Sequence, residues 1–189
     1  MIRGEHPGVR IELELVDDPE DSLREVAQGR ADLALVVVER DRTRDRTRDG
    51  IALAHLLDDP FAAVLPKGHP LAAQRVLDLP DLADEPWVAS ERPGHCLDPL
   101  LDACGAAGFS PNFAVRSEDY ATAQGFVAAG LGIGAMPLLG LGNRHPEVVV
   151  RRLRNPEPIR AIHAAIRDPS PGQPALHGLL AALRGAASP

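Results

Sequence analysis

The sequence has no long apolar run and no excess of positive charge. No apolar segment reaches about 18 residues without a glycine or proline, so we expect no membrane-spanning helix. The first residues lack the basic start and apolar core of a signal peptide, which predicts a cytoplasmic protein. The 20 lysines and arginines are outnumbered by 27 acidic residues, giving a net charge of −7. Because nucleic-acid-binding surfaces are normally basic, this charge argues against one on these 189 residues.

Cysteine is scarce, and the usual catalytic motifs are missing. Cys96 and Cys104 fall in what the pattern predicts to be one helix, which would hold them about 12 Å apart along its axis. That distance is too long for a disulfide, so we expect two free thiols. The histidines lack metal-ligand spacing, and no Gly-x-Ser-x-Gly, phosphate-loop or His-Glu-x-x-His motif occurs. The sequence therefore predicts no metal, no cofactor and no enzymatic activity.

The most informative segment is residues 120–137. Apolar residues at helical spacing from Tyr120 to Leu131 predict an amphipathic helix, and Gly130 stands where helices commonly end. The next residues alternate glycine with larger apolar side chains, which predicts a buried strand that other backbone approaches closely. Pro137 ends this strand because proline has no N–H to donate. By itself, the segment indicates a helix-to-strand unit of an α/β layer.

The first part of the chain predicts a βαβ unit. Residues 9–16 alternate apolar and charged side chains, as a half-exposed strand does. Asp18 and Pro19 precede a predicted helix over residues 20–28. The nearly continuous apolar run 31–38 predicts a strand that is buried on both faces in a parallel sheet.

The rest of the chain predicts a further alternation of strands and helices. Strands are expected at residues 51–57, 60–65, 87–89, 112–116, 132–136, 148–153 and 159–166, and helices at 79–84, 95–107, 119–129 and 174–184. Segment 39–50 is rich in arginine and aspartate, but its charges nearly cancel and it has no aromatic side chain. This composition favours a solvated loop over a nucleic-acid patch. His69 lies in a proline-flanked turn without a partner at catalytic spacing, and we expect it to be structural.

Five segments together resemble the effector-binding domain of LysR-type transcriptional regulators. In the family's order, they are residues 6–15, 29–35, 62–73, 79–88 and 126–137. The resemblance extends over nearly the whole chain. It implies an α/β fold of two Rossmann-like lobes, similar to the type 2 periplasmic binding proteins. We expect the first lobe at residues 1–65 and 155–189 and the second lobe at 66–154.

The resemblance also implies that the beginning of the domain is missing. In the family, a winged helix-turn-helix, a linker helix, and the first strand and helix of the effector domain come before the counterpart of Gly4. We therefore expect an N-terminally truncated chain with an unpaired strand edge in the first lobe. DNA would be contacted only through the absent helix-turn-helix domain. The family's homodimer would be weakened or rearranged.

Candidate effector-binding residues follow from where the predicted strands end. In sheets of this kind, ligands bind at the carboxyl ends of strands and beside helix amino termini. The residues that meet this rule are Asp18, Pro19, Val37, Val38, Ser90, Glu91, Arg92, Asp119 and Tyr120. Arg92 is the cation that we expect to meet the carboxylate of an acidic effector. Val37 and Val38 favour an effector with a hydrophobic body. Ser117 is a candidate N-cap for the helix that follows it.

The function implied by the resemblance is effector sensing. A small, acidic metabolite would bind between the two lobes and shift their relative angle. That shift would change how paired subunits present their DNA-binding domains to control transcription. The alternatives are a stand-alone small-molecule-binding protein of the same fold and a non-functional regulator fragment.

Overall fold

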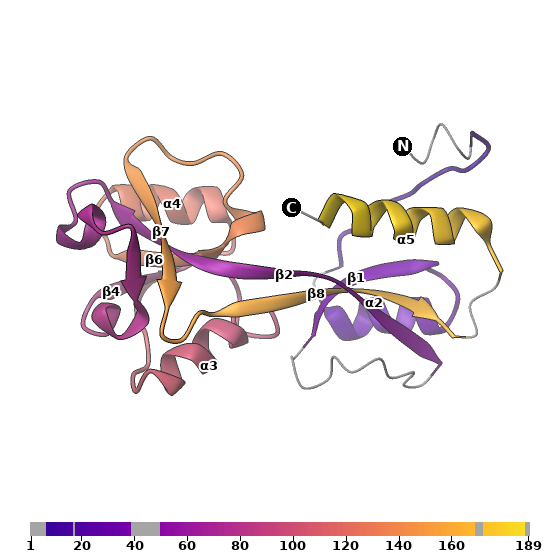
Figure 1. Ribbon diagram of the computed structural model, residues 1–189, viewed down its shortest axis with the longest axis horizontal. Helices are drawn as coiled ribbons and strands as arrows, with labels where there is room; N and C mark the ends of the chain where they lie inside the picture. Colours follow the sequence, from indigo (N-terminus) through magenta and orange to yellow (C-terminus); the bar gives the residue numbers. More distant parts are fainter. Residues whose placement is uncertain (1–6, 17, 39–49, 169–171, 188–189) are drawn as a thin grey trace. The chain divides into compact units, whose positions relative to one another are not determined.

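The computed structural model describes residues 7–16, 18–38, 50–168 and 172–187 (Figure 1). Residues 39–49 of the predicted loop lie outside the described residues. The chain divides into two compact units, which are residues 1–58 with 161–189 (unit 1) and residues 59–160 (unit 2). Two strands, β2 (Ile51–Pro66) and β8 (Ile159–Arg167), carry the chain between the units. The lobe boundaries expected from the sequence stay a prediction.

Unit 1 contains a layer of strands with a helix on each side. β1 (Leu33–Val38) pairs antiparallel with β8, and β8 lies between β1 and β2. Helices α2 (Pro19–Ala27) and α5 (Pro174–Ala187) lie on opposite sides of this layer (Figure 1). The buried hydrophobic cluster of this layer is small, is formed by Val36, Ile51 and Ala165, and has Leu23 of α2 packed against it.

Two predictions for unit 1 are wrong. Residues 9–16 form no strand, and Leu13 and Leu15 are each 94% exposed. β1 is not buried on both faces, because Leu35 is 55% exposed, and its described partner is antiparallel. An alternating pattern gives a strand only where a neighbouring strand satisfies its backbone groups. No described strand pairs with residues 9–16, so the predicted βαβ unit is absent from the described part of the chain.

Unit 2 is built on a mixed sheet. Its central order is β2–β6–β4–β5, where β6 is Ile133–Pro137, β4 is Pro86–Ala89 and β5 is Asn112–Arg116. β6 runs antiparallel to β2, whereas β4 runs parallel to both β6 and β5. On the other side of β2 lies β7 (Val148–Arg154), which also pairs with β3 (Val76–Asp78). The short 3₁₀ helices described in this unit are η2 (Pro70–Ala73), η3 (Leu79–Leu82) and η4 (Leu138–Gly140).

Alternate residues of the central strands form two separate cores. Phe61, Leu65 and Trp87 pack on the side of helix α3 (Asp98–Ala106). The neighbouring residues Val64 and Val88 pack on the side of α4 (Tyr120–Ala128). The two helices accordingly lie on opposite faces of the sheet (Figure 1). The period-2 alternation of a strand thus lets one sheet support both cores.

The elements predicted for unit 2 are confirmed with local corrections. β2 is one continuous strand and not two. Helix α3 begins only at Asp98, so Cys96 lies in the preceding turn and the two cysteines do not share a helix; both are free. Gly132 confirms the expected close approach of backbone, because a Cβ there would lie 2.5 Å from the Pro86 carbonyl oxygen. His69 Nδ1 accepts from the Leu71 N–H at 3.2 Å, and its Nε2 lies 3.2 Å from Glu85 Oε1, an acidic partner that the sequence did not indicate; its structural role stays a prediction.

Candidate functional site

Four charged or polar side chains meet in unit 2, and we call them the polar cluster. Asp59 lies on β2, Arg160 on β8, Glu91 just after β4, and Tyr120 at the start of α4. Arg160 Nε donates to Asp59 Oδ2 at 3.0 Å, and Nη2 forms an ion pair with the same oxygen at 2.9 Å. Arg160 Nη1 donates to Glu91 Oε1 at 2.9 Å and to the Tyr120 hydroxyl at 3.3 Å. The Tyr120 hydroxyl in turn donates to Glu91 Oε1.

The polar cluster is buried, which makes its pairing energetically important. The side chains of Asp59, Arg160 and Glu91 are 1%, 10% and 10% exposed. Asp59 also accepts a hydrogen bond from the Leu139 N–H at 3.0 Å on its other oxygen. Buried charges persist only where partners and hydrogen bonds offset their desolvation. Asp59 and Arg160 meet that condition, because each is the other's oppositely charged partner and Asp59 also has the Leu139 N–H as a donor.

The cluster lies where the topology favours a ligand. β4 and β6 are parallel neighbours, so their carboxyl ends share one edge of the sheet. Ser90 and Glu91 follow β4 there, and η4 follows β6. The amino terminus of α4 supplies Tyr120 beside them. This is the strand-end and helix-terminus arrangement that α/β sheets use to bind small molecules.

The absence of a side chain at Gly140 makes room for the Tyr120 ring. A Cβ built on Gly140 would lie 2.6 Å from Tyr120 Cε2, closer than any relaxed contact allows. The ring therefore packs directly on the backbone of η4. Only glycine at this position leaves room for the ring where its hydroxyl reaches Glu91.

Burial also shifts proton affinities around the cluster. Burial raises the pKa of Glu91 above its ordinary value, and the charge of Asp59 adds to this effect while Arg160 opposes it. Burial likewise raises the pKa of Cys96, with a further increase from the charge of Glu91. It raises the pKa of Cys104 to about 12. Both thiols therefore stay protonated near neutral pH, which lowers their reactivity as nucleophiles.

The structure brings some predicted site residues together. Glu91 and Tyr120 are in direct contact, and Ser90 is buried beside Glu91 at the end of β4. Asp119 is the N-cap of α4, since its Oδ1 accepts from the Thr122 N–H at 2.7 Å. The predicted cap Ser117 instead accepts from the Asp119 N–H at 3.2 Å and lies one turn outside the helix.

The other predicted site residues lie elsewhere. Arg92 is exposed and pairs with Glu118 at 2.6 Å, outside the polar cluster. Asp18 caps α2 by accepting from the Glu20 N–H at 2.9 Å, and Pro19 is the first residue of that helix. Val37 and Val38 are half-buried at the end of β1. Asp18, Pro19, Val37 and Val38 belong to unit 1, whereas Arg92 belongs to unit 2.

The strand-end rule misses Asp59 and Arg160 because both lie within strands. Each does carry a signal in the sequence. Arg160 stands near the start of β8, whose following residues are mostly apolar up to Ile166, and Asp59 precedes the apolar second half of β2. A charge within an apolar strand needs a buried partner, and the two residues supply each other's.

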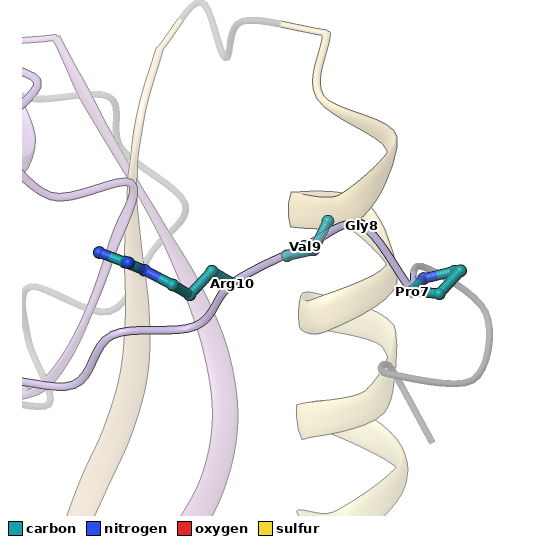
Figure 2. A pocket seen from close by; sticks show the side chains of 4 residues that line it. All are labelled: Pro7, Gly8, Val9 and Arg10. Atoms are coloured by element: carbon teal, nitrogen blue, oxygen red, sulfur yellow. The ribbon is translucent and has the colours of Figure 1, made fainter.

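A second feature is a shallow hollow in unit 1, lined by Pro7, Gly8, Val9 and Arg10. Figure 2 shows these side chains pointing away from one another along an extended stretch of chain. All four residues are exposed, so the hollow lacks the converging polar groups of a binding site. Across the described residues, no group of histidine, cysteine and acidic side chains could hold a metal ion. Among the described helices, none has the length and hydrophobicity of a transmembrane segment.

Comparison with known proteins identifies relatives along the whole chain. The LysR substrate binding domain family matches residues 1–188. A probable hydrogen peroxide-inducible genes activator of Mycobacterium avium is 34% identical over 123 residues, which are 64% of this chain and 37% of that protein. The small neutral protease regulatory protein of Streptomyces coelicolor is 32% identical over 189 residues, or 98% of this chain and 58% of that protein. The chain thus spans 37% to 58% of the length of these two relatives.

Solved structures support the same fold. The BenM effector-binding domain with its effector benzoate matches with a TM-score of 0.83 and 22% identity, covering 98% of this chain and 82% of that one. The reduced regulatory domain of OxyR from Pseudomonas aeruginosa matches with a TM-score of 0.78 and 24% identity, covering 97% and 86%. LysR effector-binding domains have the two-lobed fold of periplasmic binding proteins.

The relatives are transcriptional regulators and not enzymes. LysR regulators bind small-molecule effectors, act as oligomers and bind DNA through an N-terminal domain. The fold expected from the five sequence segments is confirmed. Because the family match covers residues 1–188, this chain belongs to the LysR substrate-binding domain family.

Proposed function

We propose that this chain is the effector-sensing domain of a LysR-family transcriptional regulator and that it binds a small, acidic metabolite at the polar cluster. The observation that carries the proposal is Arg160, a buried cation at the carboxyl ends of β4 and β6. Guanidinium groups pair well with carboxylates. The benzoate held by the BenM domain, which has the same fold, supports an acid as the effector class. We assign no catalytic step to the chain.

The proposed contacts extend the predicted set. Glu91 and Tyr120 contact the Arg160 guanidinium, and Ser90 and Asp119 are their neighbours in the sequence. Asp18, Pro19, Val37, Val38 and Arg92 remain predicted effector contacts outside the cluster. Arg92 and Arg160 are therefore rival partners for the effector's carboxylate. Arg160 is favoured because charges interact more strongly where water is excluded. Asp59 and Glu91 already share its charge, so an effector's carboxylate would bind there once one of these two carboxyl groups is neutral.

A matched pair of variants tests this assignment. Arg160→Lys and Arg92→Lys each keep the positive charge but remove the planar fork that binds a carboxylate through two hydrogen bonds. Thermal unfolding of the 189-residue chain would be followed with a panel of small acids that begins with benzoate. We expect an acid that stabilises the wild-type chain to stabilise Arg92→Lys equally and Arg160→Lys much less.

Two results would contradict the proposal. Loss of the ligand effect in Arg92→Lys alone would move the carboxylate site to the exposed pair with Glu118. A panel in which no acid raises the unfolding temperature, while another class of metabolite does, would exclude an acidic effector. Ligand-dependent stabilisation without any regulated promoter would favour the stand-alone binding protein.

We also propose that the regulator acts as a homodimer and contacts DNA only through a helix-turn-helix outside these residues. The net charge of −7 supports the second part, because it disfavours binding to phosphates. Light scattering gives the mass of the chain in solution, and a monomer at all concentrations would contradict pairing through these residues. Binding of this chain alone to duplex DNA would contradict the assignment of DNA contact.

Redox sensing is the rival function suggested by the peroxide-inducible relatives. Cys96 lies close enough to Glu91 and Arg160 to interact with both. However, peroxide reacts with thiolates, and burial keeps the pKa of Cys96 raised. A metabolite effector is therefore favoured. Rapid oxidation of Cys96 by dilute peroxide, measured by mass spectrometry, would reverse this preference.

A further inference from the structure

One oxygen atom of the polar cluster has no hydrogen-bond partner. Glu91 Oε1 accepts from both Arg160 Nη1 and the Tyr120 hydroxyl. Glu91 Oε2 is buried and accepts from nothing in the described part of the chain. Both oxygens of Asp59 have donors, in contrast, from Leu139 and Arg160. The unused hydrogen-bonding capacity of the cluster is therefore concentrated on one atom of Glu91.

The charge around that atom disfavours an ordinary anion. Four titratable or charged groups act on Glu91 from the elements packed against it. They are Asp59 on β2, Arg160 on β8, Tyr120 on α4, and Cys96 in the turn before α3. With both carboxylates ionised, Asp59, Glu91 and Arg160 together carry a net charge of about −1 at neutral pH. An incoming carboxylate would then meet repulsion as well as an unprotonated oxygen.

A proton on Glu91 removes both obstacles. Because Oε1 already accepts two hydrogen bonds, the proton belongs on Oε2, where it turns the unused acceptor into a donor. The three charged groups then sum to zero. We propose, resting on the function proposed above, that an acidic effector binds together with one proton from solvent, which Glu91 carries on Oε2 and donates in a hydrogen bond to the effector's carboxylate. Burial, which raises the pKa of Glu91, favours the same protonation.

The proposal makes Glu91 the residue that decides the charge of the ligand. A protonated Glu91 offers a donor and selects an anion. An ionised Glu91 offers an acceptor and selects a cation or a neutral donor. The two states therefore predict opposite dependences of affinity on pH for ligands of the same shape.

The test uses benzoate and benzamidine, which match in size and differ in charge. Isothermal titration of the full chain would measure both affinities from about pH 5.5 to about pH 8. We expect wild-type affinity for benzoate to fall by up to roughly tenfold per pH unit as the pH rises. Titrations in two buffers of different ionisation enthalpy should show about one proton taken up per benzoate bound.

The Glu91→Gln variant tests whether the bound proton is carried by Glu91. The amide places a permanent N–H donor near the Oε2 position and cannot titrate. We expect this variant to bind benzoate with an affinity that does not depend on pH and without proton uptake. Glu147→Gln, an exposed carboxylate paired with Lys67 in the same unit, is the matched control and should behave as wild type. The buffer comparison on the wild-type chain needs no variant and tests the proposal even if Glu91→Gln folds poorly.

The outcomes separate this inference from the proposed function. Benzoate binding by the wild-type chain with no pH dependence and no proton uptake would overturn the inference and leave the proposed function standing. Tighter binding of benzamidine as the pH rises, lost in Glu91→Gln, would overturn it in favour of an ionised Glu91 and a cationic effector. Binding of neither benzoate nor any other acid of the panel to wild type or Glu91→Gln would overturn both proposals.

Discussion

Strands β1 of unit 1 and β4 of unit 2 are both apolar, yet they bury very different fractions of their side chains. In β4, Trp87, Val88 and Ala89 are between 0% and 2% exposed. In β1, only Val36 is buried, and Leu35 is 55% exposed. β4 has a strand on each side and a helix over each face, whereas β1 has one described strand neighbour, β8. The neighbours of a strand, and not its composition alone, decide how much it contributes to stability.

The largest expected effect comes from the buried charge pair of unit 2. Arg160→Met removes the partner of Asp59 but keeps an unbranched side chain that can replace the aliphatic part of the arginine. An unpaired carboxylate would then remain buried, so we expect the free energy of unfolding to fall by about 3–5 kcal/mol. Urea unfolding followed by the fluorescence of Trp87, the chain's only tryptophan, measures the change in unit 2.

The control for that variant is an arginine of unit 1 with similar geometry. Arg30 donates to both oxygens of Glu25 at 2.6 Å, but the two side chains are 55% and 37% exposed. We expect Arg30→Met to leave the urea midpoint unchanged, because solvent screens exposed pairs. Equal losses in the two variants would show that burial does not distinguish the units.

Hydrophobic truncation should give the next largest difference. Leu100→Ala, on the buried face of α3, should lower the free energy of unfolding by about 2–5 kcal/mol. Leu35→Ala, on the exposed face of β1, should change it by less than about 0.5 kcal/mol. Circular dichroism in urea reports both. A loss in Leu35→Ala as large as that in Leu100→Ala would mean that the outer face of β1 is covered in solution, for example by a second copy of the chain.

The same contrast explains which parts of the fold can be predicted from the sequence. Helix α4 and strand β6 are bounded by local signals, with Gly130 at φ +78° after the helix and Pro137 at the strand's end. Residues 9–16 have an equally clear alternating pattern but form no strand, because a strand also needs a partner that the pattern does not encode.

Some residues of the candidate site can likewise be predicted from local sequence, and others cannot. Glu91 and Tyr120 follow from where strands end and helices begin, which is local information. The pairing of Asp59 with Arg160 joins residues 101 positions apart and appears only once β2 and β8 are placed. Arg92, next to Glu91 in sequence, points instead to the exposed Glu118. Adjacent residues at a strand end can therefore differ completely in burial and role.

A smaller effect should come from the contact that positions Tyr120. Gly140→Ala places a methyl group against the ring, so we expect a cost of about 1–3 kcal/mol from the forced shift. Gly125→Ala is the control, because its Cβ would meet nothing within 4 Å and lies inside α4. There the change should stabilise the helix, by up to about 1 kcal/mol. Urea unfolding distinguishes the two, and a stabilising Gly140→Ala would contradict the close packing.

The smallest expected effect is the dependence of stability on pH, where two glutamates of unit 2 should act in opposite directions. Burial raises the pKa of Glu91 above 4.5, so the folded chain holds its proton more tightly than the unfolded chain does. The stability linked to Glu91 is therefore fully present below about pH 4.5 and is lost as the pH rises through the raised pKa. The hydrogen bond from Arg92 lowers the pKa of the exposed Glu118. Its contribution is present above about pH 4.5 and is lost as the pH falls through the lowered pKa.

Glutamine variants isolate the two contributions. Relative to wild type, Glu91→Gln should remove a decline in the urea midpoint that occurs as the pH rises above about 4.5. Glu118→Gln should remove a weaker decline on the acid side, because solvent screens an exposed pair. Trp87 fluorescence follows both within unit 2. If the midpoint of wild type rose with pH where Glu91→Gln is flat, Glu91 would be stabilised as the anion by Arg160, and the balance between burial and pairing in the polar cluster would be the reverse of the one inferred from its geometry.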